Sequence, residues 1–265
     1  MIKEKFFKIL SVIVLAAVII SAADFYGFCE GGEAELQPGL QYIDNKICYV
    51  DSDLNMASSI GVDSSFYNGK VDFKELKKLG IDFVILRVGG RGWGNGALYE
   101  DGWFQNAVKS AHSAGLSVGV YFYSMAVNRG EAAREAEYCI EKLCGETLEL
   151  PVYIDMEFSG DYPSGRTDSL PTAERVDFAH SFCKVIKDAG YLPGVYANES
   201  FFHDELNLEA LSDYSIWLAS YTENNIPPKM EGYDIWQFTD RARIPGISGY
   251  CDLNVIFERE EYSAE

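Results

Sequence analysis

The sequence predicts an α/β fold built as an eight-stranded β/α barrel. From Ser58 onward, short runs of β-type residues alternate with helical patterns, which is typical of βα units around a parallel sheet. Eight such β-type runs occur, and eight strands close a barrel that its own side chains can fill. A length of 265 residues is ordinary for an α/β barrel that forms one domain.

The elements alternate strictly over the first two thirds of this region. We expect strands at 60–63, 83–88, 117–123, 152–155 and 194–197, separated by helices at 73–79, 103–114, 130–143 and 172–189. After Asn198 the helical patterns shorten, and the runs at 215–219, 233–238 and 252–257 predict three further strands with little helix between them. The expected fold is therefore an irregular TIM-type barrel with fewer than eight helices.

The N-terminus predicts export. Residues 1–23 combine a basic start with the uncharged run from Ile9 to Ala23, as in a signal peptide, and Ser21 and Ala23 favour cleavage after Ala23. The alternative is an uncleaved membrane anchor, although the run is shorter than the ~20 residues that span a bilayer. Residues 24–55 are expected to be a linker or irregular lead-in, and residues 56–265 the folded domain. We expect a monomer that is secreted or associated with the cell envelope, outside the cytoplasmic membrane.

Charge, histidine count and cysteine content exclude some classes of function and some kinds of site. A formal net charge of −19 would repel a phosphate backbone, so nucleic-acid binding is excluded. Three histidines and cysteine spacings that fit no zinc pattern predict no metal site, and we expect no cofactor. Six cysteines in an exported chain permit disulfides whose pairing the sequence leaves open, including one between Cys29 and Cys48. Buried free thiols are expected at the three cysteines in apolar runs: Cys139, Cys183 and Cys251.

Four acids fall at predicted strand ends, where the reactive groups of a β/α barrel lie. Asp63 closes the first strand, Asp155 and Glu157 follow the fourth, and Asp252 opens the eighth. Positions i and i+2 of a strand share a face, so Asp155 and Glu157 should enter one pocket. Mutual repulsion and apolar neighbours should raise one pKa of this pair. A protonated acid beside an ionised one is what glycosidic cleavage requires.

With these motifs in place, the chain from Gly61 to Phe257 resembles glycoside hydrolase family 25, the lysozymes that cleave peptidoglycan between N-acetylmuramic acid and N-acetylglucosamine. The segments that carry the resemblance occur in order: GVD at 61–63, FVILRVG at 83–89, GLSVGVY at 115–121, LPVYIDME at 150–157, GVYAN at 194–198, IWLA at 216–219, DIWQF at 234–238 and GYCDLN at 249–254. The resemblance implies an irregular barrel of eight strands with fewer helices, and makes residues 56–265 a catalytic domain that acts on bacterial peptidoglycan strands.

The resemblance also assigns roles to the four acids. It implies Glu157 as the general acid, Asp155 as its catalytic partner, and Asp63 and Asp252 as supporting acids of the pocket. It leaves open whether Asp155 attacks the sugar directly or steers the acetamido group of the substrate to do so. The segment 91–96, which is rich in glycine and contains a tryptophan, departs from the family pattern and is a candidate to shape the substrate groove.

Two alternatives to a muramidase remain. A chitinase-like glycosidase also ends its fourth strand with Asp-x-Glu, but its two further upstream acids are absent here, where Val152, Tyr153 and Ile154 precede Asp155. A catalytically silent wall-binding protein would have no reason to keep costly clustered carboxylates.

Aromatic side chains are candidates for sugar contacts, because sugars stack their C–H faces on aromatic rings. The expected substrate-binding residues lie on late parts of the predicted strands: Tyr123, Tyr196, Trp217, Trp236 and Gln237. Tyr123, Trp236 and Gln237 are the preferred ones because they lie nearest the reactive strand ends. Trp217 fits the barrel core equally well.

Overall fold

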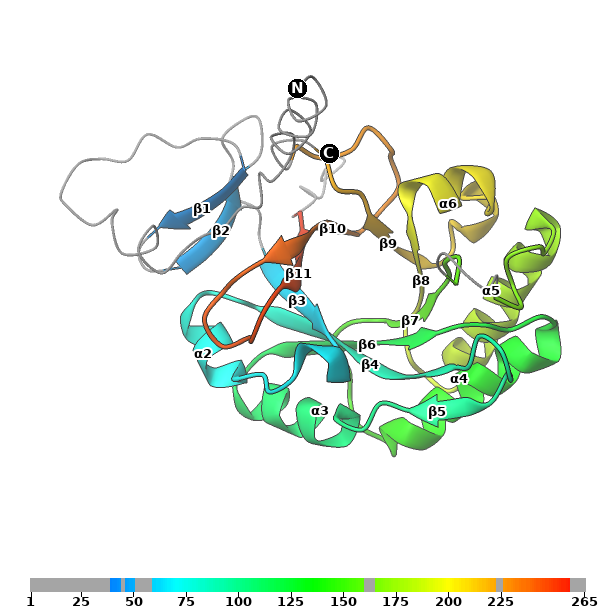
Figure 1. Ribbon diagram of the computed structural model, residues 1–265, viewed down its shortest axis with the longest axis horizontal. Helices are drawn as coiled ribbons and strands as arrows, with labels where there is room; N and C mark the ends of the chain where they lie inside the picture. Colours follow the sequence, from blue (N-terminus) through cyan, green and yellow to red (C-terminus); the bar gives the residue numbers. More distant parts are fainter. Residues whose placement is uncertain (1–38, 44–45, 51–58, 160–164, 223–225, 258–265) are drawn as a thin grey trace, which may run out of the picture.

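The computed structural model describes residues 39–43, 46–50, 59–159, 165–222 and 226–257. Eight strands form a closed barrel (Figure 1), because the first of them pairs with both the second and the last. This confirms the predicted barrel, and most strand ends lie within two residues of the expected ones. The strands are β3 (Ser59–Ser64), β4 (Phe83–Arg91), β6 (Ser117–Tyr123), β7 (Val152–Asp155), β8 (Pro193–Asn198), β9 (Ser215–Ala219), β10 (Ile235–Ala242) and β11 (Cys251–Ile256).

The helices are fewer than the strands, as predicted. Five α-helices occur in the described residues: α2 (Phe73–Lys78), α3 (Phe104–Ser113), α4 (Arg129–Leu143), α5 (Thr172–Asp188) and the short α6 (Glu199–Asp204). Two 3₁₀ turns, η1 (Phe66–Asn68) and η2 (Glu209–Leu211), complete the helical elements described. In Figure 1, α3 and α4 lie along the side of the barrel formed by β4 and β6.

The last strand runs against its neighbours. β3, β4, β6, β7, β8, β9 and β10 are parallel from one strand to the next, whereas β11 is antiparallel to both β10 and β3. The start of β11 therefore lies at the same rim as the ends of the other strands. A loop suffices to connect β10 to β11, because antiparallel neighbours need no crossover helix.

The barrel interior is filled by side chains. A separate apolar cluster inside it comprises Phe83, Ile85, Tyr153, Trp217 and Ile235, all at most 2% exposed. Gly61 and Gly194 make room for two of these rings. A Cβ atom at Gly61 would lie 2.2 Å from the ring of Phe83, and one at Gly194 would lie 2.3 Å from the ring of Tyr153.

The described part of the predicted lead-in is ordered, which corrects the expectation for 24–55. β1 (Gly39–Ile43) and β2 (Lys46–Val50) form an antiparallel hairpin. Tyr49 of β2 is buried and packs edge-on against Trp236 of β10 at a ring-centroid distance of 5.6 Å. The expectation of an irregular segment missed this apolar contact, which holds the hairpin against the barrel.

A second unexpected strand follows β4. β5 (Leu98–Glu100) is antiparallel to the end of β4, so the glycine-rich segment between them is the turn of a hairpin rather than a free loop.

The predicted signal or anchor at 1–23 and Cys29 lie outside the described residues. No helix in the described part of the chain is long and apolar enough to cross a membrane. Cys139, Cys183 and Cys251 are buried free thiols, as predicted.

Candidate active site

The four predicted acids meet at one rim of the barrel. Asp63, Asp155 and Glu157 lie at or just beyond the ends of β3 and β7, and Asp252 joins them because β11 starts at this rim. Asp63 and Asp155 are each only 5% exposed, whereas Glu157 and Asp252 are half-buried. The arrangement concentrates four carboxyl groups in a poorly solvated site.

Asp155 lies between two tyrosines on neighbouring strands. In the strand register Asp155 is opposite Tyr123 of β6 on one side and Tyr196 of β8 on the other. Val152 and Ile154 of β7 are buried in the outer core, so the alternating positions Tyr153 and Asp155 face the interior. The Oδ1 atom of Asp155 is buried and has no hydrogen-bond partner among the described residues. A buried acceptor in this position is suited to receive a donor from a substrate.

The pair of acids after β7 is poised to hold a proton. Burial raises the pKa of Glu157 to about 6. Burial also raises the pKa of Asp155 well above its usual range, and the charges of Glu157 and Asp63 add to this effect. Glu157 borders a small pocket whose lining includes Arg175 as well as the apolar side chains of Met156 and Phe201. The apolar neighbours contribute to its loss of solvation.

Asp63 and Asp252 form a second carboxyl pair. Burial raises both pKa values, and the Asp63 charge helps to raise that of Asp252 to about 9. The two side chains are hydrogen-bonded to each other. The Oδ2 atom of Asp63 also accepts hydrogen bonds from Gln237 Nε2 at 2.8 Å and from Asn254 Nδ2 at 2.9 Å. These two amide donors stabilise a charged Asp63 beside a protonated Asp252.

A hydrogen-bond network under the site links these amides to aromatic side chains. Asn254 Oδ1 accepts from the indole of Trp217 at 2.8 Å. Gln237 Oε1 accepts from the hydroxyls of Tyr196 and Tyr221, at 3.0 and 2.8 Å. Since every member has a partner, the network fixes the orientation of Asp63 at the floor of the site.

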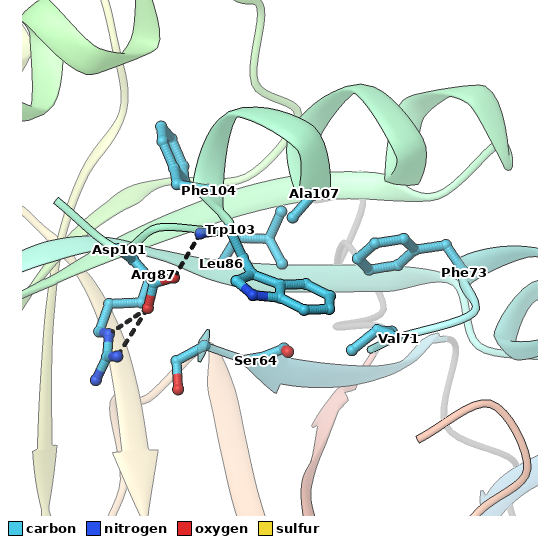
Figure 2. Close-up of a pocket in the computed structure, with 10 residues that line it drawn as sticks. Ser64, Val71, Phe73, Leu86, Arg87, Asp101, Trp103, Phe104 and Ala107 are labelled. Carbon is cyan, nitrogen blue, oxygen red and sulfur yellow. Dashed lines mark hydrogen bonds and ion pairs between the residues drawn. The ribbon is translucent and has the colours of Figure 1, made fainter. Parts of the chain in front are cut away.

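One cation faces the acids from β4. Arg87 forms an ion pair with Asp101, at 2.7 and 2.8 Å (Figure 2), and its charge lowers the pKa of Asp155. Asp101 also accepts backbone hydrogen bonds from Phe66 and Trp103. The guanidinium carbon of Arg87 lies 4.8 Å from the ring centre of Tyr67. This ion pair limits the negative potential around Asp155 and orders the segments that flank it.

Exposed aromatic side chains gather at the same rim. Every strongly exposed aromatic residue among those described lies in a segment that follows or borders these strand ends: Phe66, Tyr67, Trp93, Tyr99, Phe158, Tyr221 and Tyr250. Such a concentration of apolar rings around buried carboxylates is typical of a carbohydrate-binding groove.

The structure separates the predicted substrate contacts into three groups. Tyr123 and Tyr196 flank Asp155, and Gln237 is in the site but bonds to Asp63 from a buried position. Trp217 is 1% exposed and belongs to the floor. Trp236 is a correction, because it is 0% exposed and packs outside the barrel against Tyr49, where a sugar cannot touch it.

Sequence reasoning missed several polar partners of the site. Strand alternation places Asn254 on the same face as Asp252, two positions earlier, so its place in the site could have been found from the sequence. Arg87 could have been found in the same way, because it follows Ile85 by two positions and Ile85 faces the barrel interior. Tyr99 could not, because nothing in the sequence marked 98–100 as a strand that folds back on β4. Among the described residues, no group of three or more His, Cys, Asp or Glu side chains could hold a metal ion.

Comparison with known proteins agrees with this geometry. The family model described as glycosyl hydrolases family 25 matches residues 62–247. The chain is 27% identical over 201 residues to the autolytic lysozyme of Clostridium acetobutylicum, an alignment that covers 75% of this chain and 56% of that protein.

Solved structures share the fold. The spore cortex lytic enzyme SleM of Clostridium perfringens aligns with a TM-score of 0.65 at 26% identity, over 75% of this chain and 67% of that one. The modular autolysin LytC of Streptococcus pneumoniae aligns with a TM-score of 0.69 at 24% identity, over 84% of this chain and 53% of that one. The chain thus spans little more than half the length of the autolytic lysozyme and of LytC.

Proposed function

Because the chain belongs to glycosyl hydrolases family 25, we propose that it is a muramidase, which hydrolyses the β-1,4 bond between N-acetylmuramic acid and N-acetylglucosamine in peptidoglycan. Its similarity to a protein named as an autolytic lysozyme supports this substrate class. The reaction needs no cofactor, because protein carboxyl groups can supply both the acid and the partner that glycoside cleavage requires.

One observation carries the proposal: two carboxyl groups with raised pKa values follow the same strand at the reactive rim. Glu157, with a pKa of about 6, keeps a proton in weakly acidic solution and can release it to a leaving group. Asp155 offers a buried oxygen with no partner in the described part of the chain. A general acid beside a buried acceptor matches the two tasks of the reaction.

In the first step, Glu157 gives its proton to the glycosidic oxygen as the bond from that oxygen to the anomeric carbon breaks. Asp155 accepts a hydrogen bond from the N–H of the 2-acetamido group of the same sugar. The acetamido carbonyl oxygen then attacks the anomeric carbon and closes a five-membered ring. This substrate-assisted route is an established exception to direct carboxylate attack. The partnerless Oδ1 atom of Asp155 is suited to receive such an N–H donor.

In the second step, the ionised Glu157 removes a proton from a water molecule that attacks the anomeric carbon. The ring opens, the acetamido group is restored, and Glu157 regains its proton. Asp63 and Asp252 contribute indirectly. The charge of Asp63 raises the pKa of Asp155, and Asp252 hydrogen-bonds to Asp63. Tyr123 and Tyr196 flank Asp155 and are the proposed contacts of the bound sugar.

Digestion of purified peptidoglycan with identification of the new reducing ends tests the proposal. N-acetylmuramic acid at these ends is the expected result. N-acetylglucosamine ends would instead support a glucosamine-specific, chitinase-like enzyme, and binding without any new ends would support a wall-binding protein. Either of these two results would overturn the proposal.

We further propose that the protein works as a monomer outside the cytoplasmic membrane, where peptidoglycan is found. The basic start and uncharged run of residues 1–23 support export. N-terminal sequencing of the protein from culture medium and from membranes separates release from tethering. A mature terminus at Asp24 in the medium is expected, whereas an intact residue 1–23 segment in a membrane-bound species would show a tether.

A further inference from the structure

The hairpin formed by β4 and β5 stands at the reactive rim and exposes two aromatic rings. Trp93, in the turn of the hairpin, is 49% exposed, and Tyr99, in β5, is 39% exposed. Covering an exposed indole with a ligand removes its apolar surface from water, which favours binding. An exposed indole is therefore a candidate binding surface.

The turn of this hairpin is attached to the segment that follows Glu157. The backbone N–H of Arg166 donates to the carbonyl oxygen of Trp93 at 3.3 Å. The carboxylate of Asp168, two residues later, accepts from the backbone N–H and hydroxyl of Ser159, at 3.0 and 2.7 Å. Ser159 is only two positions beyond Glu157. Trp93 is thus tied, through two short links, to the strand end that carries the proposed acid.

Tyr99 lies closer to the reacting groups. Burial raises its pKa, Arg87 lowers it, and the charge of Asp155 raises it further, so the phenol is within electrostatic range of both groups. The pKa of Tyr123 is likewise raised, after burial, by the charges of Glu157 and Asp155 and by Tyr99. The strand register agrees: Tyr99 is opposite Gly90 of β4, Gly90 is opposite Tyr123 of β6, and Tyr123 is opposite Asp155 of β7. Trp93 follows the end of β4, in the turn of the same hairpin.

A buried ion pair fixes the base of the hairpin. Arg91, at the end of β4, is 7% exposed, and its Nε lies 2.6 Å from Oε1 of the fully buried Glu135 on α4. Arg91 also donates to the carbonyl oxygens of Gly96, across the hairpin turn, at 2.8 Å, and of Glu131 at 3.1 Å. Ser124, which follows Tyr123, donates to the other oxygen of Glu135 at 2.6 Å.

The same anchor extends to the segment after β7. Glu131 binds the guanidinium of Arg166 with both carboxylate oxygens, at 2.9 and 3.0 Å. Buried ion pairs contribute little net stability compared with apolar packing, so their main effect can be to define a geometry. Here the geometry defined is the position of the hairpin beside the strand end of Glu157.

We propose that Trp93 and Tyr99 form a saccharide-binding platform for glycan units beyond the pair that flanks the cleaved bond. Tyr99 is level with Tyr123 and Asp155 in the strand register, and Trp93 lies in the turn beyond the end of β4. Arg91 and Glu135 are positioning residues that hold the platform. The proposal rests on the proposed muramidase function, and it assigns a role to the segment 91–96 that family membership leaves unassigned.

Binding of glycan fragments of two lengths tests the platform without cleavage. In a Glu157→Gln background, isothermal titration compares a tetrasaccharide with an octasaccharide of alternating N-acetylglucosamine and N-acetylmuramic acid. Trp93→Ala is expected to weaken octasaccharide binding about tenfold, as typical for loss of an aromatic anchor, and tetrasaccharide binding about twofold at most. Tyr99→Ala should weaken binding of both fragments, whereas Tyr99→Phe, which keeps the ring, should bind both normally.

Leu192→Ala is the matched control. Leu192 is 63% exposed and immediately precedes β8, at the rim opposite the site, so its removal should change neither affinity. The platform would be overturned, with the muramidase function left intact, if Glu157→Gln binds the octasaccharide and the added Trp93→Ala change leaves that affinity unaltered. If Glu157→Gln binds neither fragment and the native protein leaves peptidoglycan uncut, the proposed function itself fails.

Glu135→Gln tests the positioning role in the otherwise native protein. The expected result is a KM for long glycan strands raised about fivefold, with kcat within about twofold of the native value, because a misplaced platform weakens ground-state binding. Glu135→Asp, which keeps the charge, should restore part of the loss. An equal fall in kcat on long and short substrates, with no rescue by Asp, would overturn the positioning role.

Discussion

Asp252 lies directly opposite Asp63 in the antiparallel register of β11 and β3, and their carboxyl groups are hydrogen-bonded to each other. This contact depends on the reversed direction of the last strand, since a parallel β11 would start at the other rim. The two amide donors on Asp63, from Gln237 and Asn254, favour placing the shared proton on Asp252. The site thus retains a carboxyl pair at the cost of folding stability.

Asp252→Asn should stabilise the protein. With its pKa raised to about 9, Asp252 stays protonated in the folded state, while the unfolded chain releases the proton above the ordinary value of 3.8. The group therefore destabilises the fold progressively as pH rises from 3.8 towards 9. At pH 7 we expect the variant to gain about 2 kcal/mol, or ~6 °C in Tm, and at pH 4 almost nothing. Thermal unfolding at both pH values measures this.

Asp213→Asn serves as its control, because Asp213 is exposed and precedes β9, at the opposite end of that strand from the site. It should leave Tm within about one degree at either pH. A loss of stability in Asp252→Asn at pH 7 would mean that the proton is not held on Asp252.

Asp155→Asn should reduce kcat by ~10²- to 10³-fold, because the proposed route requires an ionised Asp155 to orient and polarise the acetamido group. The charge of Arg87, which opposes the rise in the pKa of Asp155, favours this ionised form. Steady-state kinetics on soluble glycan fragments gives this number. Intact-protein mass spectrometry of the native enzyme, quenched during turnover, then distinguishes the two routes. We expect no covalent sugar on the protein, and a glycosyl ester on Asp155 would replace the acetamido-assisted route with direct attack.

The value of kcat/KM should fall as the pH rises above the pKa of Glu157. Glu157 must be protonated to act as the acid, and burial raises its pKa to about 6. Activity is therefore present below about pH 6 and should decline about tenfold per unit above it. Rates measured from pH 4 to 9 on a soluble fragment test this. A flat profile through pH 8 would show that the proton comes from another group.

The acid pair could be predicted from the sequence because the information was local. Asp155 and Glu157 follow an apolar run at i and i+2, which predicts that they share a face. In the structure β7 ends at Asp155, and Glu157 lies just beyond the strand, within electrostatic range of Asp155. The same alternation places Trp236 and its neighbour Gln237 on opposite faces of β10, so the two cannot both face inward. Gln237 faces the site, and Trp236 packs against Tyr49 of the β1–β2 hairpin.

The remaining parts of the site depend on pairing between distant segments. Local patterns can mark Asp63, Gln237 and Asn254 as residues of the site, but not that they hydrogen-bond to one another, because these contacts join positions separated by 174 and 191 residues. The hairpin of β4 and β5 was obscured by its glycines, which usually indicate a loop. The hairpin is held in place by the ion pair between Arg91 and the buried Glu135, two residues that are 44 positions apart in the sequence.

The most direct test of Glu157 as the general acid is the rate at which Glu157→Gln releases new N-acetylmuramic acid reducing ends from purified peptidoglycan. Glutamine keeps the size of the side chain but cannot donate an acidic proton, so the fold should remain intact by circular dichroism and thermal unfolding. We expect a rate ~10²- to 10⁴-fold below that of the native protein. A folded variant that keeps more than about a tenth of the native rate would contradict the assignment of Glu157 as the acid.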